Sequence, residues 1–474
     1  MTVPSINAGR SLRRLSDLPS PPGLPLLGNA LQLRGPRLHL TMEDWARTYG
    51  PSYRFRIGPR DAMVVAGHDT VLEVLRARPD GFRRPAMVEK ICDELGEPTG
   101  IFLSEGEKWK RQRRMIMHGF SPQAVKRYFP RLVQVSQRLR KRWEAAAREQ
   151  RSVGLGDDLK RYTVDTLAGL AFGADINTVE TSGENIQHHI DIVLDGMGRR
   201  QMSPFPYWRY LKLPQDRRLE RSARAVSRAT AEFIAQVKAE MASAPHLADT
   251  PATLLQAMLA VSTEPDSGLD DDDVVGNVAT LLIAGEDTTA SSLTWLVWLL
   301  VQNPDALQRA RAEVLQHAPD PAAFSIEQMD ALDYVEACAQ EAMRLKPATP
   351  FIPLETLSDR EVNGVLVPAG TLLFCLVRHD CMDDKLFPQA GRFLPERWLP
   401  GGDALRQAVL PFGAGARMCP GRYLSLLEIK VAIAMLLASF DVLEVSAAGR
   451  STPEEMMSFV MTPSALQMRL RARS

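Results

Sequence analysis

The chain has 474 residues, which at about 150 residues per domain allows about three domains or one large enzyme domain. Lysine plus arginine and aspartate plus glutamate each number 57, so the formal net charge is zero. This argues against a nucleic-acid binder held by a positive field over its whole surface. The five cysteines show no CxxC spacing, which excludes a disulfide framework or a cysteine-rich zinc module and indicates a reducing compartment.

The N-terminal 37 residues differ from the rest of the chain. Arg10, Arg13 and Arg14 precede a proline-rich segment, 20–28, that cannot be helical because each proline fixes its own φ and restricts the residue before it. A short basic leader of this kind is compatible with a transit peptide, but it lacks an apolar run of signal-peptide length. We expect residues 1–37 to form an extension with an extended surface strap, and residues 38–474 to form a single domain.

Helical periodicity dominates from about residue 38 to residue 260. Two short alternating stretches within it, 53–57 and 62–65, predict a hairpin around a Gly-Pro turn. A helix over 334–345 is followed by short strands separated by turn residues, and the tail over 440–470 alternates like strands. The sequence therefore predicts a mostly α fold with small β-sheets. Its apolar runs are shorter than the roughly 18 residues that a membrane span needs.

The longest predicted helix begins at the four carboxylates of residues 270–273, since a helix N-terminus favours negative charge. The apolar pattern continues to Gln302, and Asn303-Pro304 then ends it. About 30 residues at 1.5 Å each give a helix of about 45 Å, which is long enough to cross the whole domain.

A glycine-rich loop over residues 411–421 carries one cysteine. Gly413 and Gly415 permit a tight turn, and Pro420 suits the first position of a helix, so Cys419 would lie at a helix N-terminus that stabilises a thiolate. A permanently ionised sulfur of this kind suits an axial ligand of haem iron. The alternative is a glycine-rich turn with a buried cysteine. A phosphate loop fits less well, because the third glycine of a dinucleotide fingerprint and a Gly-Lys-Ser/Thr sequence are both missing.

This loop resembles the cysteine signature of the cytochrome P450 haem-thiolate monooxygenases, Phe-x-x-Gly-x-Arg-x-Cys-x-Gly with a favoured extra glycine. The matching residues are Phe412, Gly413, Gly415, Arg417, Cys419 and Gly421. The resemblance extends from Pro21 to Leu470. It implies the cytochrome P450 fold, a triangular prism with the long helix over haem b (iron protoporphyrin IX), and it makes Cys419 the iron ligand and the other five residues part of the haem site.

Within the long helix, the sequence Ala-Gly-Glu-Asp-Thr-Thr from Ala284 sets small and polar residues in an apolar segment. We expect the helix to open or bend there, because glycine weakens a helix and a threonine hydroxyl can bond the carbonyl four residues back. A polar kink without chemistry is the alternative. The resemblance implies that Asp287 and Thr288 are the catalytic acid–alcohol pair, that Ala284 and Gly285 face the haem, and that Glu286 fills a variable position.

Glu341 and Arg344 share one face of a predicted helix, a spacing that alone usually gives an exposed ion pair worth little energy. Residues 393–398, Phe-Leu-Pro-Glu-Arg-Trp, resemble a second family element. The resemblance implies that Arg397 completes a buried Glu–Arg–Arg triad, which supports the cysteine loop without taking part in catalysis.

Trp109 and Arg113 are four residues apart on a predicted helix, and the resemblance implies that they and Arg417 contact the haem propionates. Many relatives carry a further basic residue after the Glu-x-x-Arg helix, but this chain has Phe-Ile-Pro-Leu-Glu at 351–355, so one propionate contact is not expected. The other basic residues beside Trp109 are Lys108, Lys110, Arg111 and Arg114. They form either a solvated helix face or a patch that steers an acidic electron donor.

The resemblance implies a cytoplasmic monooxygenase that uses dioxygen and two electrons from a separate ferredoxin or flavodoxin with its reductase. Its substrate would be a lipophilic fatty acid, terpenoid or steroid-like molecule, hydroxylated or epoxidised. The alternatives are a peroxide-driven peroxygenase and a non-enzymatic haem sensor, and the proton-delivery pair disfavours both. The residues expected to line the substrate pocket are Phe82, Met87, Leu281, Ala284, Phe351, Ile352 and Met461.

Overall fold

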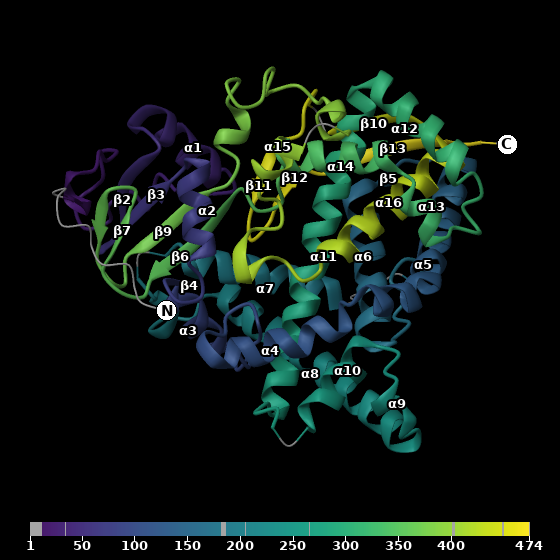
Figure 1. Cartoon of the computed structure of the whole chain (residues 1–474), viewed down its shortest axis with the longest axis horizontal. Helices are drawn as coiled ribbons and strands as arrows, with labels where there is room; N and C mark the ends of the chain where they lie inside the picture. Colours follow the sequence, from purple (N-terminus) through teal and green to yellow (C-terminus); the bar gives the residue numbers. More distant parts are fainter. Residues whose placement is uncertain are drawn as a thin grey trace.

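The structure is a computed structural model that describes residues 12–33, 35–181, 186–203, 205–264, 266–400, 403–447 and 450–473. Arg10 of the expected basic leader lies outside these residues. Helices predominate, as predicted, and fill most of a roughly triangular outline (Figure 1). The α-helices are α1 (Leu38–Tyr49), α2 (His68–Arg76), α3 (Ala86–Leu95), α4 (Gly106–Gly119), α5 (Pro122–Arg148), α6 (Leu155–Phe172), α7 (Ile186–Gln201), α8 (Pro214–Ser243), α9 (His246–Asp249), α10 (Leu254–Ser262), α11 (Asp271–Gln302), α12 (Pro304–His317), α13 (Ile326–Asp330), α14 (Asp333–Leu345), α15 (Asp403–Gln407) and α16 (Arg422–Ser439).

The strands form small sheets, the largest at one side of the molecule (Figure 1). They are β1 (Arg13–Arg14), β2 (Ser52–Ile57), β3 (Arg60–Val65), β4 (Phe82–Arg83), β5 (Val153–Gly154), β6 (Phe351–Thr356), β7 (Arg360–Val362), β8 (Val365–Val367), β9 (Leu372–Leu376), β10 (Phe440–Ala447), β11 (Glu455–Met457), β12 (Met461–Pro463) and β13 (Leu466–Ala472). The strand orders in the described chain are β2-β3-β9-β6-β4, β1-β8-β7, β10-β13-β5 and β11-β12. The mostly α fold with minor sheets is thereby confirmed.

The predicted hairpin is present as β2 and β3. The strands pair antiparallel from Ser52 opposite Val65 to Ile57 opposite Arg60, and Gly58 takes a φ of 59° in the turn. The strap before it departs from the expected extended form, because the segment from Leu24 to Leu33 consists mostly of turns. Gly28 bridges to Leu24 and to Ile57, so the strap is fastened to the edge of β2.

The longest predicted helix is confirmed as α11, which runs through the middle of the molecule (Figure 1). Asp270 is its N-cap: its carboxylate accepts the backbone N–H of Asp273 at 2.8 Å, and the Asp273 carboxylate accepts the N–H of Asp270 at 3.1 Å. This capping box satisfies two N–H groups that would otherwise lack partners. Most α11 side chains are buried, and the helix packs against α6, α14 and α16.

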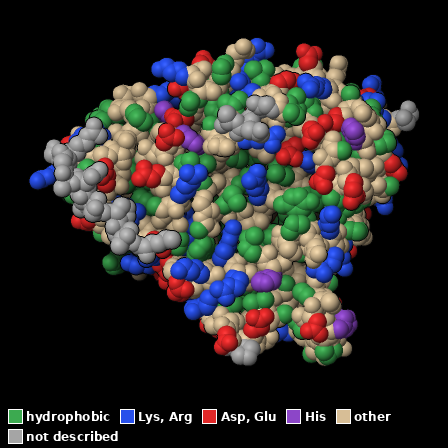
Figure 2. Space-filling view, viewed as in Figure 1, with side chains coloured by type: hydrophobic (Ala, Val, Ile, Leu, Met, Phe, Trp, Pro, Cys, Tyr) green, Lys and Arg blue, Asp and Glu red, His purple; other side chains and the backbone are tan. Residues whose placement is uncertain are grey.

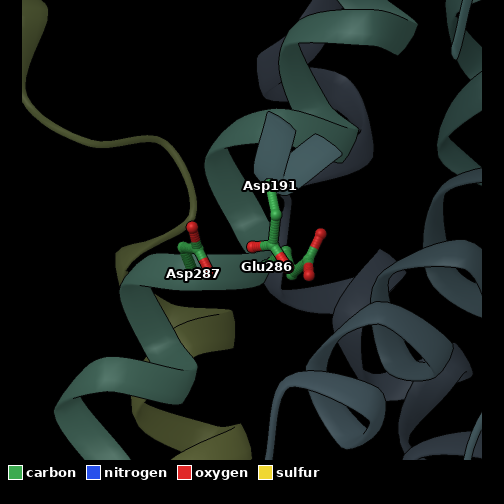
Figure 3. Close-up of side chains that lie close together, drawn as sticks. All are labelled: Asp191, Glu286 and Asp287. Carbon is green, nitrogen blue, oxygen red and sulfur yellow. The ribbon is translucent and has the colours of Figure 1, made fainter. Parts of the chain in front are cut away.

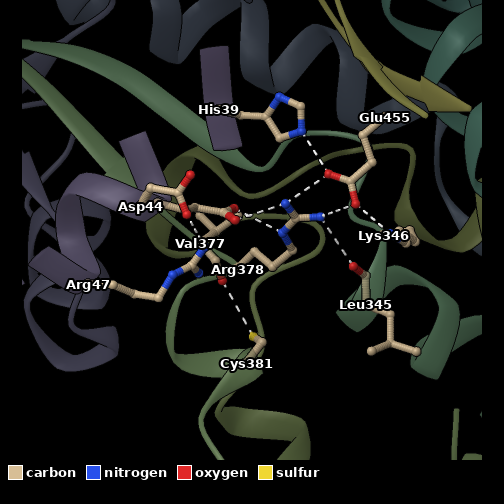
Figure 4. Close-up of polar contacts among 10 residues, drawn as sticks. His39, Asp44, Arg47, Leu345, Lys346, Val377, Arg378, Cys381 and Glu455 are labelled. Atoms are coloured by element: carbon tan, nitrogen blue, oxygen red, sulfur yellow. Dashed lines mark hydrogen bonds and ion pairs between the residues drawn. The ribbon is translucent and has the colours of Figure 1, made fainter. Parts of the chain in front are cut away.

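Arg378 ties the sheet region to the helices. Its guanidinium makes two 2.9 Å bonds to Glu43 of α1, and bonds of 3.0 and 2.9 Å to Glu455 of β11. Glu455 also accepts from His39 and Lys346, so segments far apart in the sequence meet at one point (Figure 4). No helix in the described ranges is long and apolar enough to cross a membrane.

Candidate active site: a cavity between the cysteine loop and the long helix

A cavity of about 310 Å³ separates α11 from the cysteine loop, residues 411–421. This volume lies in the range of small-molecule and cofactor sites, roughly 300–1,000 Å³. Ala284, Gly285 and Thr288 of α11 line one side. The lining residues from the cysteine loop include Phe412, Gly413, Arg417, Cys419 and Gly421. The structure thus brings together two motifs that are more than 120 positions apart in the sequence.

The cysteine loop is held in shape by its backbone. Cys419 donates its N–H to the carbonyl of Phe412 at 2.9 Å, closing the loop. Gly413 and Gly415 have φ of 71° and 69°, a conformation that favours glycine. A Cβ on Gly415 would lie 2.9 Å from the backbone of Leu75, so this glycine serves packing against α2 and does not line the cavity.

The expected position of Pro420 at the start of the last helix is wrong. Helix α16 begins at Arg422 with Gly421 as its N-cap, because the chain makes one further turn after the proline. The pKa of Cys419 also differs from the expectation of a sulfur ionised by the helix terminus. Burial raises this pKa, and the N–H of Gly421 and the cation of Arg113 lower it by smaller amounts. A thiolate at Cys419 therefore calls for a bound cation beside it.

Arg417 lies between the cysteine loop and α4. It donates to the carbonyls of Ile101 at 3.2 Å and Ser104 at 2.7 Å, and it pairs with Glu105. Its guanidinium stacks over the ring of Trp109 at 4.4 Å. Trp109 and Arg113 line the same cavity, so the three residues that the sequence grouped by resemblance lie on one wall.

Two further arginines that sequence reasoning missed line this cavity, Arg78 and Arg84. With Arg113 and Arg417 they form what we call the arginine cluster. Glu105 is the carboxylate that attracts Arg78, Arg84 and Arg417, so three of the four guanidiniums share one carboxylate. Neither arginine belongs to a recognisable sequence motif. Arg78 follows α2 and Arg84 follows β4, and the fold brings both into the cavity.

The arginine cluster is short of partners. The buried Nε atoms of Arg78, Arg84 and Arg417 have no hydrogen-bond partner among the described residues. Burial lowers the pKa of Arg84 to about 9, with repulsion from Arg78 and Arg417 adding to it, and burial lowers the pKa of Arg417 to about 10. An anionic ligand in this cavity would accept hydrogen bonds from the unpaired buried donors and neutralise the excess positive charge. The two carboxylates of a haem, with its iron at Cys419, fit this arrangement.

Thr288 faces the cavity from the opposite side. Its hydroxyl donates to the carbonyl of Ala284 at 2.9 Å, the bond that the sequence predicted for a threonine in a helix. Helix α11 continues without a break through this motif, so the predicted opening is wrong, whereas the predicted bend remains a prediction. The helix does not need to open, since the small residues Ala284 and Gly285 already leave room on this face.

Asp287 does not line the cavity but turns toward α6 and α7. Its carboxylate lies 2.7 Å from Nζ of Lys160, which also lies 2.6 Å from Asp191 of α7. Burial raises the pKa of Asp287, and Lys160 opposes this shift. Thr288 and Asp287 therefore lie on different faces of α11. The hydroxyl of Thr288 faces the cavity, and the carboxylate of Asp287 faces α6, where it pairs with Lys160.

Glu286, which the sequence treats as a variable position, is fully buried beside this ion pair. One oxygen each from Asp191, Glu286 and Asp287 lies within 4.8 Å of the others (Figure 3). Neither carboxyl oxygen of Glu286 has a hydrogen-bond partner in the described chain. Burial and the two neighbouring carboxylates raise its pKa well above the usual range, while Lys160 lowers it by a smaller amount.

Glu341, Arg344 and Arg397 meet in a buried cluster. Arg344 makes two 2.8 Å bonds to Glu341, and Nε of Arg397 lies 3.3 Å from the same carboxylate. Trp398 adds a bond of 2.9 Å from its indole N–H. Glu341 and Arg344 are almost completely buried, which distinguishes them from an ordinary surface pair.

The expected substrate-pocket residues divide into two groups. Leu281, Ala284 and Ile352 line the cavity. The prediction is wrong for four residues that pack into the protein interior instead: Phe82, Met87, Phe351 and Met461. Phe82 lies beneath Arg360, and Phe351 packs against Phe374, because successive side chains of a strand point to opposite faces and in β6 it is Ile352 that faces the cavity.

The expected basic patch on α4 is weaker than the sequence implies. Lys108 lies 3.1 Å from Asp273 and Lys110 lies 2.6 Å from Glu107, so two of its charges are paired. Arg111 packs beside Gly268, and Arg114 is exposed. Basic side chains still gather on the visible face where α4 lies (Figure 2). The α4 surface thus remains basic with a reduced local charge.

A mostly helical fold with a cavity-facing cysteine, a buried arginine cluster and an opposing small-residue helix is typical of haem-thiolate proteins. A family model described as Cytochrome P450 matches residues 18–470. The chain belongs to the cytochrome P450 family and is a monooxygenase, an oxidoreductase whose family holds a haem iron through a cysteine thiolate.

Similar proteins come from bacteria, plants and mammals. Cyclooctat-9-en-7-ol 5-monooxygenase of Streptomyces melanosporofaciens is 29% identical over 88% of this chain and 87% of its own. Cytochrome P450 71B37 of Arabidopsis thaliana is 26% identical over 89% and 86%. Taurochenodeoxycholic 6 alpha-hydroxylase of Sus scrofa is 25% identical over 91% and 86%.

Proposed function

We propose that this protein inserts one atom of dioxygen into a C–H or C=C bond of a lipophilic small molecule. It uses haem b at Cys419 and two electrons from a separate ferredoxin or flavodoxin with its reductase. The observation that carries this proposal is the placement of Cys419 and Thr288 on opposite sides of one cavity. We further propose residues 38–474 as the catalytic domain, residues 1–37 as its extension, and the cytoplasm as its location.

The residues around the cavity divide the work of holding the cofactor. Cys419 would ligate the iron, and the arginine cluster with Trp109 would bind the two propionates. Glu341, Arg344 and Arg397 would support the cysteine loop from behind. When bound, the haem supplies dioxygen binding and reduction, and the thiolate favours O–O cleavage.

Proton delivery falls to α11 and its neighbours. The Thr288 hydroxyl donates its one proton to the carbonyl of Ala284, so it is placed to accept a hydrogen bond from the cavity and donates there only when it rotates away from this carbonyl. Behind it, Asp191 and Lys160 connect the partly exposed surface of α7 to Asp287, and Glu286, whose pKa is raised, lies beside them. We propose that Asp287 takes protons from this group and that Thr288 positions them at the reacting site.

The lining favours a lipophilic substrate, since aliphatic and aromatic side chains dominate it. The names of two relatives refer to oxidation of a cyclic alcohol and of a bile acid conjugate. We therefore propose polycyclic terpenoid-like or steroid-like molecules as the first substrates to screen, with fatty acids as the next class. The α4 surface around Arg114 would receive the acidic electron donor.

Turnover with reduced ferredoxin and isotopically labelled dioxygen tests this proposal. We expect one labelled oxygen atom in each product molecule and little turnover with hydrogen peroxide alone. Equal or faster turnover with peroxide alone would identify a peroxygenase instead. Binding of haem without any product across the screened classes would favour a sensor.

A further inference from the structure

A second, smaller cavity of about 70 Å³, which we call the lobe, adjoins the first on the side away from the cysteine loop. Phe102, Thr280 and Ala284 line both, so the two are separated only by these side chains. The lobe lies among α3, α7, α8 and α11, and apolar side chains such as Leu194 and Val226 make up most of its wall.

One carboxylate stands in this apolar wall, that of Glu97. Helix α3 ends at Leu95, its C-cap Gly96 with a φ of 77° reverses the chain, and the N–H of Glu97 then bonds the carbonyl of Cys92 at 3.1 Å. The following segment lies directly on α11, because a Cβ on Gly100 would be 2.2 Å from the carbonyl oxygen of Gly276. The backbone that carries Glu97 is therefore held in place against the long helix.

The Glu97 carboxylate is only partly satisfied. One oxygen, Oε1, accepts from the hydroxyl of Ser227 on α8, and this hydroxyl also lies 3.1 Å from the carbonyl of Ala223. The second oxygen, Oε2, forms no hydrogen bond with the described residues and is not sealed inside the protein, so it is accessible to a ligand. Burial raises the pKa of Glu97, and Ser227 lowers it by a smaller amount. An accessible acceptor among apolar side chains favours a ligand that donates a hydrogen bond to it.

We infer that Glu97 is the polar recognition group of the substrate site and binds a hydroxyl at the end of the substrate remote from the reacting carbon. This inference rests on the proposed function, since it assumes that oxidation occurs beside Ala284 and Thr288. The lobe follows α11 from Ala284 back to Gly276, eight residues or about 12 Å of helix. A small monocyclic molecule does not span this distance, whereas a polycyclic or long-chain alcohol does.

A neutral hydroxyl fits this place better than an ammonium group. The lobe offers one open carboxylate oxygen among apolar walls, which cannot replace the hydration shell of an ammonium with its three donors. A hydroxyl needs a single acceptor and leaves the rest of the molecule in contact with apolar side chains. The predicted substrate class is therefore a lipophilic alcohol.

The test is a binding titration of the haem-loaded protein, followed by the shift of the Soret band and checked by equilibrium dialysis. The probes are geranylgeraniol and pregnenolone, each compared with its methyl ether, which accepts but does not donate, and with the corresponding amine. We expect at least one of the alcohols to bind about tenfold or more tightly than its ether, the range for a hydrogen bond to a charged group. In Glu97→Leu we expect this ratio to fall to about one, whereas Glu97→Gln keeps an acceptor and retains part of it.

Asp93→Asn is the matched control, because Asp93 lies four residues earlier, is exposed and does not line the lobe. Its alcohol-to-ether ratio should equal that of the unmodified protein. The inference is overturned if the unmodified protein shows no preference for either alcohol, if the preference survives in Glu97→Leu, or if the amines bind more tightly than the alcohols. The thiolate-shifted band of the reduced, carbon-monoxide-bound protein is recorded for every variant. If that band is missing from the unmodified protein, the proposed function fails and not the role of Glu97.

Discussion

The arginine cluster leads to a prediction that differs between the haem-free and the haem-bound protein: its positive charge destabilises the first and helps to bind the haem in the second. Arg84 is buried against Arg78 and Arg417, and its pKa falls to about 9. At 1.36 kcal/mol per pH unit, the drop from the ordinary value of an arginine corresponds to roughly 5 kcal/mol against the charged side chain. Without an anionic ligand, this charge destabilises the fold. With the two haem propionates in place, the same charge becomes a binding group.

The substitution Arg84→Leu should therefore stabilise the haem-free protein and weaken haem binding. We expect the free energy of unfolding of the haem-free form at pH 7 to rise by up to about 5 kcal/mol, as measured by urea denaturation. Because the folded-state pKa lies below the unfolded one, the cost is complete below pH 9 and declines as the pH rises above it. Haem transfer to an excess of apomyoglobin should become about 10 to 100 times faster, the range for one or two lost charge-assisted bonds.

Arg83→Leu provides the control, since Arg83 is the neighbouring residue, pairs with Glu89 and does not line the cavity. Its haem transfer rate should stay close to that of the unmodified protein. If Arg84→Leu instead destabilises the haem-free form and leaves the transfer rate unchanged, Arg84 is a structural residue and the assignment of the arginine cluster to the propionates is wrong.

Two further predictions concern catalysis and stability. Thr288→Ala should uncouple the reaction, so that electron consumption continues while the ratio of product to electrons falls severalfold; an unchanged ratio would contradict the proposed proton delivery. Arg378→Met leaves Glu43 and Glu455 buried without their shared cation and should cost about 3–5 kcal/mol of unfolding free energy in a denaturant titration. Burial alone would raise the pKa of Glu455, but His39, Arg378 and Lys346 hold it well below the usual range. A depressed carboxyl pKa stabilises the fold above the unfolded value of about 4.3, and this contribution is lost on acidification below it. The unmodified protein should therefore lose stability more steeply in acid than Arg378→Met, and equal slopes would contradict this explanation.

The elements that were predicted correctly are those with a strong local signal. Helix α11 has a capping box at Asp270 and a proline at its end, and the β2–β3 hairpin has alternating residues around Gly58. These signals depend on neighbours in the sequence, so the sequence shows them directly. The cysteine signature is also a local signal, because its glycines and its cysteine lie within one stretch of about ten residues.

The features that were missed depend on which distant segments meet. Arg78 and Arg84 line the cavity because the fold brings the ends of α2 and β4 to it, and no sequence motif predicts this arrangement. Phe82 and Phe351 were expected in the pocket, but an aromatic residue on a strand can face either side, and the sheet register turns these two into the interior. The burial of Glu286 likewise depends on the packing of α6 and α7 against α11.

The most direct test of the central claim is the absorption spectrum of the reduced, carbon-monoxide-bound protein, recorded for the unmodified chain and for Cys419→Ser. If Cys419 ligates the haem iron, the unmodified protein shows the red-shifted Soret band of a thiolate complex, and the variant loses it even where it still retains haem. Cys381→Ser, a buried cysteine outside the cavity, should keep the band. Absence of the band in the unmodified protein, or its persistence in Cys419→Ser, would contradict the account.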